Sequence, residues 1–222
     1  MPILVAGFSA FPGIPASPSG DLARSLGAGG ETVAAASEAD AAPVHAVVLP
    51  VEWGRSWPVL RTAIEAVRPQ TVLLFGLHLR SERFRVEMQA RNFRELGRGD
   101  AVESFPAGPS ILDGPATLPL RLPWTRVAEA LRGAGIAFEW STHAGGYVVN
   151  DTLYRLAFAA TALGVERYGL FHLPMSDERV EECAQAGGLP EVFLSLPFAD
   201  IERAASALVA TIRDLEGGHE TR

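Results

Sequence analysis

The sequence predicts one α/β domain in which short strands are joined by crossover helices, and three observations lead to this prediction. Its 222 residues suit one large domain. Hydrophobic residues make up 48% and charged residues 20%, which is ordinary for a globular protein with a full core. In the first half of the chain, short apolar runs alternate with helical patterns, which favours crossover helices over a β-sandwich. We therefore expect a single domain over residues 1–222.

The first half of the chain contains three expected strands and two expected helices. The strands are residues 2–8, Val44–Leu49 and Thr71–Leu77. The third strand is apolar on both faces, as a central parallel strand should be. The helices are residues 19–26 and 57–67, and the second shows apolar residues at helical spacing and ends before Pro69. The segment 27–43, which is small and polar, is expected to be mostly loop.

In the segment 82–92, apolar residues recur at every second position. Phe84, Val86, Met88 and Ala90 alternate with charged and polar residues, which predicts one strand with one buried face. Glu87 is expected on the polar face. Residues 93–123 are rich in glycine, proline and charge, so we expect a long excursion with little regular structure, of a length that is often functional.

The second half continues the alternation of helices and strands. We expect helices at residues 127–134 and 148–163, strands at residues 136–141 and Arg167–Leu173, and an irregular segment at residues 174–196. A last helix carries an apolar stripe formed by Ile201, Ala205, Leu208 and Ile212. No internal repeat and no linker between domains is recognisable.

Composition and charge exclude several classes of function. The formal net charge is −7, and no basic cluster with interleaved aromatic residues occurs, so nucleic acid is not an expected partner. No run of about 18 apolar residues is present, so no membrane span is expected, and the opening residues are interpreted as a first strand. Cys183 is the single cysteine, which rules out an internal disulfide and argues against a thiolate metal cluster. A cytoplasmic location without a cofactor is expected.

The carboxyl ends of the strands are where a site is expected. In open α/β sheets the loops diverge at this edge and helix N-termini point into the crevice. The segments that follow the strands here are residues 8–11, 77–80, 143–146 and 172–174.

Four separated motifs resemble one known family. They are "GFSAFPG" with "SPS", "LPVEW", "VEMQARN", and "STHAGGYVVN" with "FHLP". Their order and spacing resemble pyroglutamyl peptidase I, also called pyrrolidone-carboxylate peptidase. The resemblance implies a three-layer α/β/α sandwich with a twisted, mixed and mostly parallel sheet. It also implies a thiol peptidase that removes N-terminal pyroglutamate from peptides and assembles as a dimer or tetramer.

The resemblance implies positions for the three residues of a catalytic triad, and one of the three differs in this chain. Glu87 matches the family's carboxylate and His172 its imidazole. The family's nucleophile lies in S-x-x-A-G-x-Y-x-C-N, and Val149 stands at the position of the cysteine. Valine cannot form a thiolate, and in a serine protease the loss of the nucleophile costs on the order of 10⁶ in turnover. The resemblance therefore predicts that thiol peptidase activity is absent.

Three other residues carry a thiol or hydroxyl that could replace the missing nucleophile. Cys183, eleven residues after His172, would have to fold back across the site. Thr152 lies one helical turn beyond the position of the cysteine. Ser9 lacks the nucleophile-elbow pattern, because Phe11 stands where the second glycine is needed.

The expected ligand site differs from the family's pattern as well. Phe8 and Phe11 match phenylalanines that pack on the pyrrolidone ring in the family, although plain core packing explains them equally. The family has G-Q-A where this chain has Gly76, Leu77 and His78, so an amide that bonds the lactam is missing. With Gly145 and Tyr147, these residues form the predicted site for a small peptide or pyroglutamate-like ligand.

A metal site is an alternative interpretation of the same region. His78, His143 and His172 fall near strand ends together with Glu87, and histidines with a carboxylate can bind a divalent metal. Scattered histidines more often bond to backbone or water, so no metal is expected. Glu87 and His172 can also be a relic pair that satisfies its own hydrogen bonds.

Three functions remain open at the level of the sequence. The first is a non-catalytic protein with a ligand-binding or structural role. The second is a hydrolase in which Glu87 and His172 activate water, with or without a metal at His78 or His143. The third is an active pyroglutamyl peptidase that uses Cys183 as a relocated nucleophile.

Overall fold

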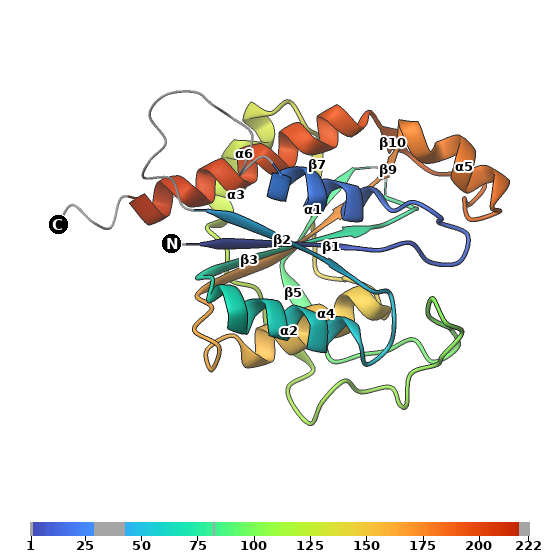
Figure 1. Ribbon diagram of the computed structural model, residues 1–222, viewed down its shortest axis with the longest axis horizontal. Coiled ribbons are helices and arrows are strands. Elements are labelled where there is room, and N and C mark those ends of the chain that lie inside the picture. The colour runs from blue at the N-terminus through green and yellow to red at the C-terminus, as the bar shows by residue number, and fades with distance from the viewer. Residues whose placement is uncertain (1, 29–42, 82, 218–222) are drawn as a thin grey trace.

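The structure of the protein is a computed structural model that describes residues 2–28, 43–81 and 83–217 (Figure 1). Its main sheet contains six strands: β1 (Ile3–Phe8), β2 (Val44–Leu49), β3 (Thr71–Leu77), β4 (Phe84–Glu87), β7 (Phe138–Ser141) and β8 (Arg167–Leu173). The helices are α1 (Pro18–Ala28), α2 (Ser56–Val67), α3 (Trp124–Gly133), α4 (Val148–Ala159), α5 (Val180–Gln185) and α6 (Phe198–Gly217). A 3₁₀ turn, Asp177–Arg179, precedes α5.

The main sheet is mixed and mostly parallel, in the order β2-β1-β3-β8-β4-β7. β4 runs antiparallel to β8, whereas the other neighbours pair in parallel. Two small sheets lie beside it, one of β5 (Gln89–Arg91) with β6 (Thr117–Pro119), and one of β9 (Met175–Ser176) with β10 (Ser195–Leu196). The predicted α/β class with a mixed sheet is confirmed.

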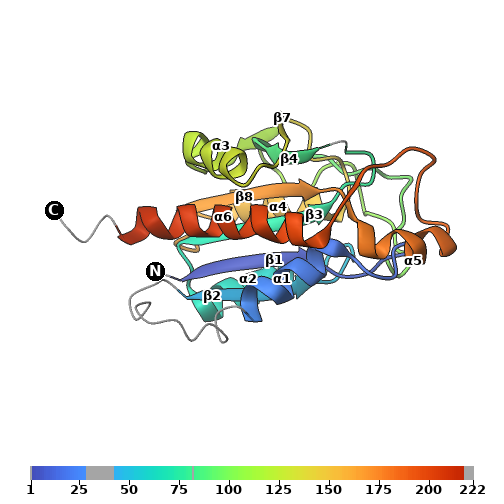
Figure 2. The same cartoon turned by 90° about the horizontal axis from the view of Figure 1, so that it is seen from above.

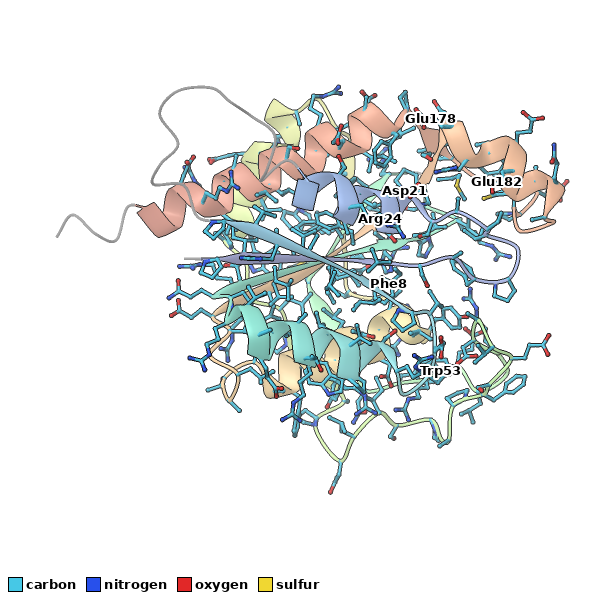
Figure 3. All side chains as sticks on the ribbon, in the orientation of Figure 1. Phe8, Asp21, Arg24, Trp53, Glu178 and Glu182 are labelled. Carbon is cyan, nitrogen blue, oxygen red and sulfur yellow. The ribbon has the colours of Figure 1, made fainter. Side chains whose placement is uncertain are left out.

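Helices cover both faces of the sheet, which gives three layers. In Figures 1 and 2, α1, α3 and α6 lie on one face, and α2 and α4 lie on the other. Side chains fill the space on both sides of the strands (Figure 3), and they form two apolar cores, one for each face. Burial of these apolar surfaces is the main force that holds the layers together.

The close approach of α1 to the sheet depends on a glycine in β1. A Cβ atom at Gly7 would lie 1.8 Å from the backbone oxygen of Ser19 in α1, so no larger residue fits. The Ser19 hydroxyl accepts a hydrogen bond from the backbone N–H of Phe8 at 3.2 Å. These contacts fix the end of β1 against the start of α1, next to the candidate site.

The single strand predicted for residues 82–92 is wrong, because the segment divides at Met88. The backbone of Met88 bonds to Ser141 on one side and to Leu120 on the other. The chain therefore leaves the main sheet after β4, and β5 pairs with β6 instead. The periodicity could not show this, since the break depends on partners distant in sequence.

Other boundaries differ only in detail from the sequence predictions. The helix expected to reach residue 163 ends at Ala159 and continues as turns. The irregular segment 174–196 contains the short helix α5. Residues 93–123 have only β6 as regular structure, as expected. Most of the loop predicted for residues 27–43 lies outside the described residues. No helix in the described ranges is long and apolar enough to cross a bilayer.

Candidate active site

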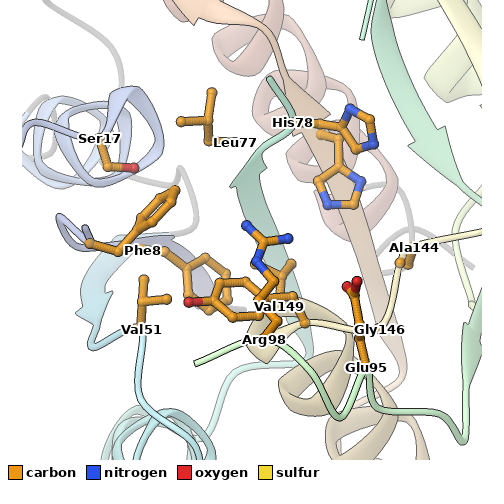
Figure 4. A pocket seen from close by; sticks show the side chains of 14 residues that line it. Phe8, Ser17, Val51, Leu77, His78, Glu95, Arg98, Ala144, Gly146 and Val149 are labelled. Atoms are coloured by element: carbon orange, nitrogen blue, oxygen red, sulfur yellow. The ribbon is translucent and has the colours of Figure 1, made fainter. Parts of the chain in front are cut away.

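The carboxyl ends of β1, β3 and β8 meet the start of α4 around one cavity of about 140 Å³ (Figure 4). This is the edge of the sheet at which the sequence predicted a site. Its lining consists of Phe8, Phe11, Ser17, Val51, Leu77, His78, Glu95, Arg98, Ala144, Gly145, Gly146, Tyr147, Val149 and His172.

Glu87 and His172 form a buried hydrogen-bonded pair beside the cavity. Oε1 of Glu87 lies 2.8 Å from Nδ1 of His172, and the two residues are 0% and 3% exposed. The antiparallel pairing of β4 with β8 brings them together, since it places Arg85 opposite His172 and Glu87 opposite Leu170. With Nδ1 engaged by the carboxylate, Nε2 is the ring nitrogen left for chemistry in the cavity.

Glu87 lies on the face of β4 opposite Phe84 and Val86, as the alternation predicts, but the expectation that only one face of this strand is buried is wrong. β4 is an interior strand between β8 and β7, so side chains on both of its faces are covered. Burial alone would raise the pKa of Glu87, but the hydrogen bond and charge of His172, the Ser141 hydroxyl and the Arg85 guanidinium hold the pKa below its usual value. Glu87 is therefore a buried carboxylate that its surroundings keep ionised.

Val149 lies in the first turn of α4, directly across from His172. The helix begins after Tyr147, whose backbone is extended. A Cβ atom built on Gly76 would lie 3.1 Å from Cγ1 of Val149 and 3.2 Å from Cδ2 of His172. The valine side chain and the imidazole thus both border the open face of Gly76 on β3, and a larger residue there would require one of them to shift by a few tenths of an ångström.

The start of α4 is held in place by hydrogen bonds to β5 and its loop. The Asn150 side chain accepts a bond from the N–H of Arg91 and donates to the carbonyls of Arg91 and Phe93. The preceding turn uses Gly145 with φ 79°, a conformation that favours glycine. These contacts fix the direction of residue 149.

His78 contacts the pair without joining it. Its ring meets the His172 ring edge-on with centroids 5.3 Å apart, and its Nε2 lies 3.2 Å from a guanidinium nitrogen of Arg85. Burial, together with the charges of His172 and Arg85, lowers the pKa of His78 to about 4. A neutral His78 that accepts a hydrogen bond from Arg85 explains this geometry.

The metal interpretation gains no support from the arrangement of the histidines. His143 is exposed, and its Nδ1 accepts a hydrogen bond from the backbone N–H of Gly145. The Arg85 guanidinium lies between His78 and Glu87, where a cation would be repelled. Within residues 2–28, 43–81 and 83–217, no group of three or more His, Cys, Asp or Glu residues is placed to hold a metal ion.

None of the three replacement nucleophiles reaches His172. Cys183 is 0% exposed in α5, where it packs with Ile14 and Met175, and burial raises the pKa of its thiol. In Figure 3, α5, marked by Glu182, lies on the opposite side of the sheet from Trp53. The Thr152 hydroxyl donates to the carbonyl of Val148, and the Ser9 hydroxyl donates to that of Ala10. None of these residues lines the cavity.

The predicted ligand-binding residues do gather at the cavity. Phe8, Phe11, Leu77, Gly145 and Tyr147 line it, and Gly76 lies directly behind it. Sequence reasoning missed one wall, which the loop after β5 supplies through Glu95 and Arg98. In the sequence, only the length of that loop indicated that it could contribute to a site, because its charged residues follow no regular spacing.

Comparison with known proteins places this geometry in a family. A family model described as pyroglutamyl peptidase matches residues 1–212. The chain belongs to the pyroglutamyl peptidase family. The pyrrolidone-carboxylate peptidase of Chromobacterium violaceum is 32% identical over 178 residues, covering 80% of this chain and 79% of that protein. The corresponding protein of Gloeobacter violaceus is 30% identical over 220 residues, covering 97% and 94%.

Solved structures of the family have the same fold. Pyroglutamyl peptidase I of Bacillus amyloliquefaciens superimposes with a TM-score of 0.80 at 25% identity, covering 94% of this chain and 95% of that chain. A mutant pyrrolidone carboxyl peptidase from Pyrococcus furiosus gives a TM-score of 0.82 at 24% identity, covering 95% and 97%. The pyroglutamyl peptidase fold is therefore present along nearly the whole chain.

Proposed function

We propose that this member of the pyroglutamyl peptidase family performs no thiol peptidase reaction and binds a small ligand in the cavity beside His172. The observation that carries the proposal is the position of Val149. Val149 stands at the sequence position that carries the cysteine in the family motif, and its Cγ1 and the His172 ring border the same space beside Gly76. An aliphatic side chain has no proton to transfer and no lone pair for attack, so acyl-enzyme chemistry cannot begin there.

The location of the only sulfur nucleophile in the chain supports the same proposal. Cys183 is fully buried in a separate apolar cluster, and the raised pKa of its thiol opposes formation of a thiolate. Relocated thiol catalysis would require α5 to leave its packing. The ligand cavity persists without the nucleophile, because Phe8, Phe11 and Tyr147 form it from other elements.

The proposal predicts no release of fluorophore from a fluorogenic pyroglutamyl amide. Loss of the nucleophile lowers turnover by roughly 10⁶, which brings an ordinary enzyme below detection. The measurement uses pure protein with an authentic pyroglutamyl peptidase as positive control, before and after treatment with iodoacetamide. Turnover in the usual range of about 1–10³ s⁻¹ would contradict the proposal. If iodoacetamide abolished such turnover, Cys183 would be the nucleophile.

A hydrolase that activates water is the second candidate, and the free nitrogen of His172 favours it. Glu87 orients the ring through Nδ1, and no hydrogen bond from the described residues engages Nε2 beside the cavity. Such a pair can act as a general base. A panel of small amides and esters tests this function. Hydrolysis that disappears in His172→Gln supports it, and hydrolysis unchanged in that variant excludes it.

The oligomeric state is expected from resemblance to the family, and the location from the absence of a recognisable signal segment and membrane span in the sequence. We expect a homo-oligomer of two or four copies and a cytoplasmic location, and both stay predictions. The proposal for the cavity does not depend on either.

A further inference from the structure

The loop that follows β5 places two opposite charges on one wall of the cavity. Glu95 and Arg98 both line the cavity, and Figure 4 shows their side chains rising from this loop toward its interior. The rest of the lining combines apolar side chains with the rings of His78 and His172 and the side chain of Ser17. The following inference rests on the proposed function, because it names the chemical class of ligand for the same cavity.

The loop holds its shape through hydrogen bonds at both ends of this wall. The N–H of Glu95 donates to the carbonyl of Gly146 at 2.8 Å, and the Tyr147 hydroxyl donates to the carbonyl of Gly99 at 3.0 Å. Beyond it, the buried carboxylate of Asp100 accepts hydrogen bonds from the backbone of Val102, Ser104 and Trp53. The two charged side chains therefore start from a preorganised backbone.

Neither charge has an ionic partner in the described part of the chain. The Arg98 guanidinium lies 3.9 Å from the centre of the Tyr147 ring, a cation–π contact that leaves its N–H groups able to donate. Although Glu95 and Arg98 are only three residues apart, they form no ion pair with each other or with any other described residue. Two opposite charges that are not paired with each other, beside the cavity, are complementary to a ligand that carries both signs and replaces the water around these exposed side chains.

The remainder of the lining suits an apolar side chain. Phe8, Phe11, Leu77 and Val149 surround the inner cavity of about 140 Å³. Glu95 and Arg98 also border a wider outer cavity of about 570 Å³, which Arg80 and Leu189 help to line. Glu95 and Arg98 thus lie between the inner cavity and the wider outer cavity.

We propose that this site binds a zwitterionic α-amino compound, either a free amino acid or a short peptide with an unblocked N-terminus. The ammonium pairs with Glu95, the carboxylate pairs with Arg98, and the apolar first side chain enters the inner cavity. Charge-assisted hydrogen bonds of this kind are about twice as strong as neutral ones. A pyroglutamyl group has a neutral lactam nitrogen in place of the ammonium, so it leaves Glu95 without a partner.

Calorimetric titration of the full chain tests the ligand class with five compounds. They are leucine, leucyl-alanine, N-acetyl-leucine, leucinamide and pyroglutamyl-alanine. Leucine or leucyl-alanine should bind at least about tenfold more tightly than N-acetyl-leucine, which lacks the ammonium, and than leucinamide, which lacks the carboxylate. Tighter binding of leucyl-alanine than of leucine would identify a peptide as the preferred source of the zwitterion.

Two variants test the assignment of each charge. Glu95→Gln should remove the advantage of the unblocked compound over N-acetyl-leucine, and Arg98→Gln should remove its advantage over leucinamide. Both positions are exposed, so the fold is expected to persist, and circular dichroism checks this. Glu65→Gln and Arg61→Gln are matched controls on the exposed face of α2, and they should leave every affinity unchanged.

The outcomes separate this inference from the proposed function. Equal or tighter binding of pyroglutamyl-alanine or N-acetyl-leucine overturns the zwitterion assignment while the cavity remains a ligand site. Binding of none of the five compounds also overturns it. Turnover of the fluorogenic pyroglutamyl amide contradicts the proposed function whatever the titrations give.

Discussion

At the scale of single residues, the site contains a buried carboxylate–imidazole pair with the side chain of Val149 nearby. Glu87 and His172 share one buried hydrogen bond, and Arg85 adds a positive charge beside the carboxylate. Removing one member of a buried pair leaves an uncompensated charge, which costs about 3–5 kcal/mol. Stability alone therefore gives a reason for this pair to persist without catalysis, as the relic-pair interpretation supposes.

His78 should make the stability of the folded protein depend on pH. Its pKa is lowered to about 4, whereas an unfolded chain takes up this proton near pH 6.5. Between these values the unfolded state binds more protons, so the free energy of unfolding falls as pH drops from 6.5 toward 4. The loss is at most about 3 kcal/mol.

Urea denaturation at pH 7 and pH 4.5 measures this effect. In His78→Gln the free energy of unfolding should fall less between the two pH values than in the unchanged protein, because the titrating group is gone. The difference between the two falls therefore reports the titration of His78 together with its electrostatic interaction with Glu87. An equal fall in both proteins would show that His78 is not held neutral by its surroundings.

At the scale of elements, the sequence patterns correctly predicted those strands whose bounds do not depend on tertiary contacts. β2, β3 and β8 were predicted with their observed bounds, because runs of apolar residues between turn signals define buried strands without distant partners. The strand expected over residues 82–92 failed, since its division at Met88 depends on Leu120 and Ser141. The alternation also did not predict the burial of Glu87, because this burial depends on neighbouring strands that are distant in sequence.

Asn150 is the residue that connects α4 with β5, and its replacement tests this connection. The side chain is fully buried and makes three hydrogen bonds to the backbone of Arg91 and Phe93. Asn150→Ala leaves those backbone groups unpaired, so we expect a loss of about 2–4 kcal/mol in the free energy of unfolding, measured with urea. Thr161→Ala, at an exposed position beyond the same helix, should cost less than about 0.5 kcal/mol. Similar values for the two variants would contradict the role given to Asn150.

At the scale of the whole molecule, the topology of the sheet brings the site together from distant segments. The antiparallel β4 carries Glu87 to β8, and α4 carries Val149 to the end of β3. Alternating strands and helices predicted the α/β class and the family resemblance implied a mixed sheet, but the strand order and the antiparallel direction of β4 are known only from the structure. The same fold can host different functions when a single position changes.

The candidate site was predictable only in part, for physical reasons. Glu87, His172 and Val149 were found because motifs preserve their spacing along the chain. Glu95 and Arg98 were missed, since residues of a loop without periodicity reach the cavity only through contacts such as the hydrogen bond from Glu95 to Gly146. Burial of Cys183 likewise depends on packing against Ile14, far away in sequence.

We propose that residue 149 faces His172 at a helix N-terminus that would lower the pKa of a thiol placed there. The most direct test is the rate of alkylation of Val149→Cys by iodoacetamide as a function of pH, with the modified residue located by mass spectrometry. Val148→Cys is the matched control, because Val148 is buried in the core one residue earlier. The account predicts a reactive thiol at position 149 with a pKa below the usual value of about 8.5, and protection at position 148. A thiol at position 149 that is unreactive, or that titrates at or above about 8.5, would contradict it.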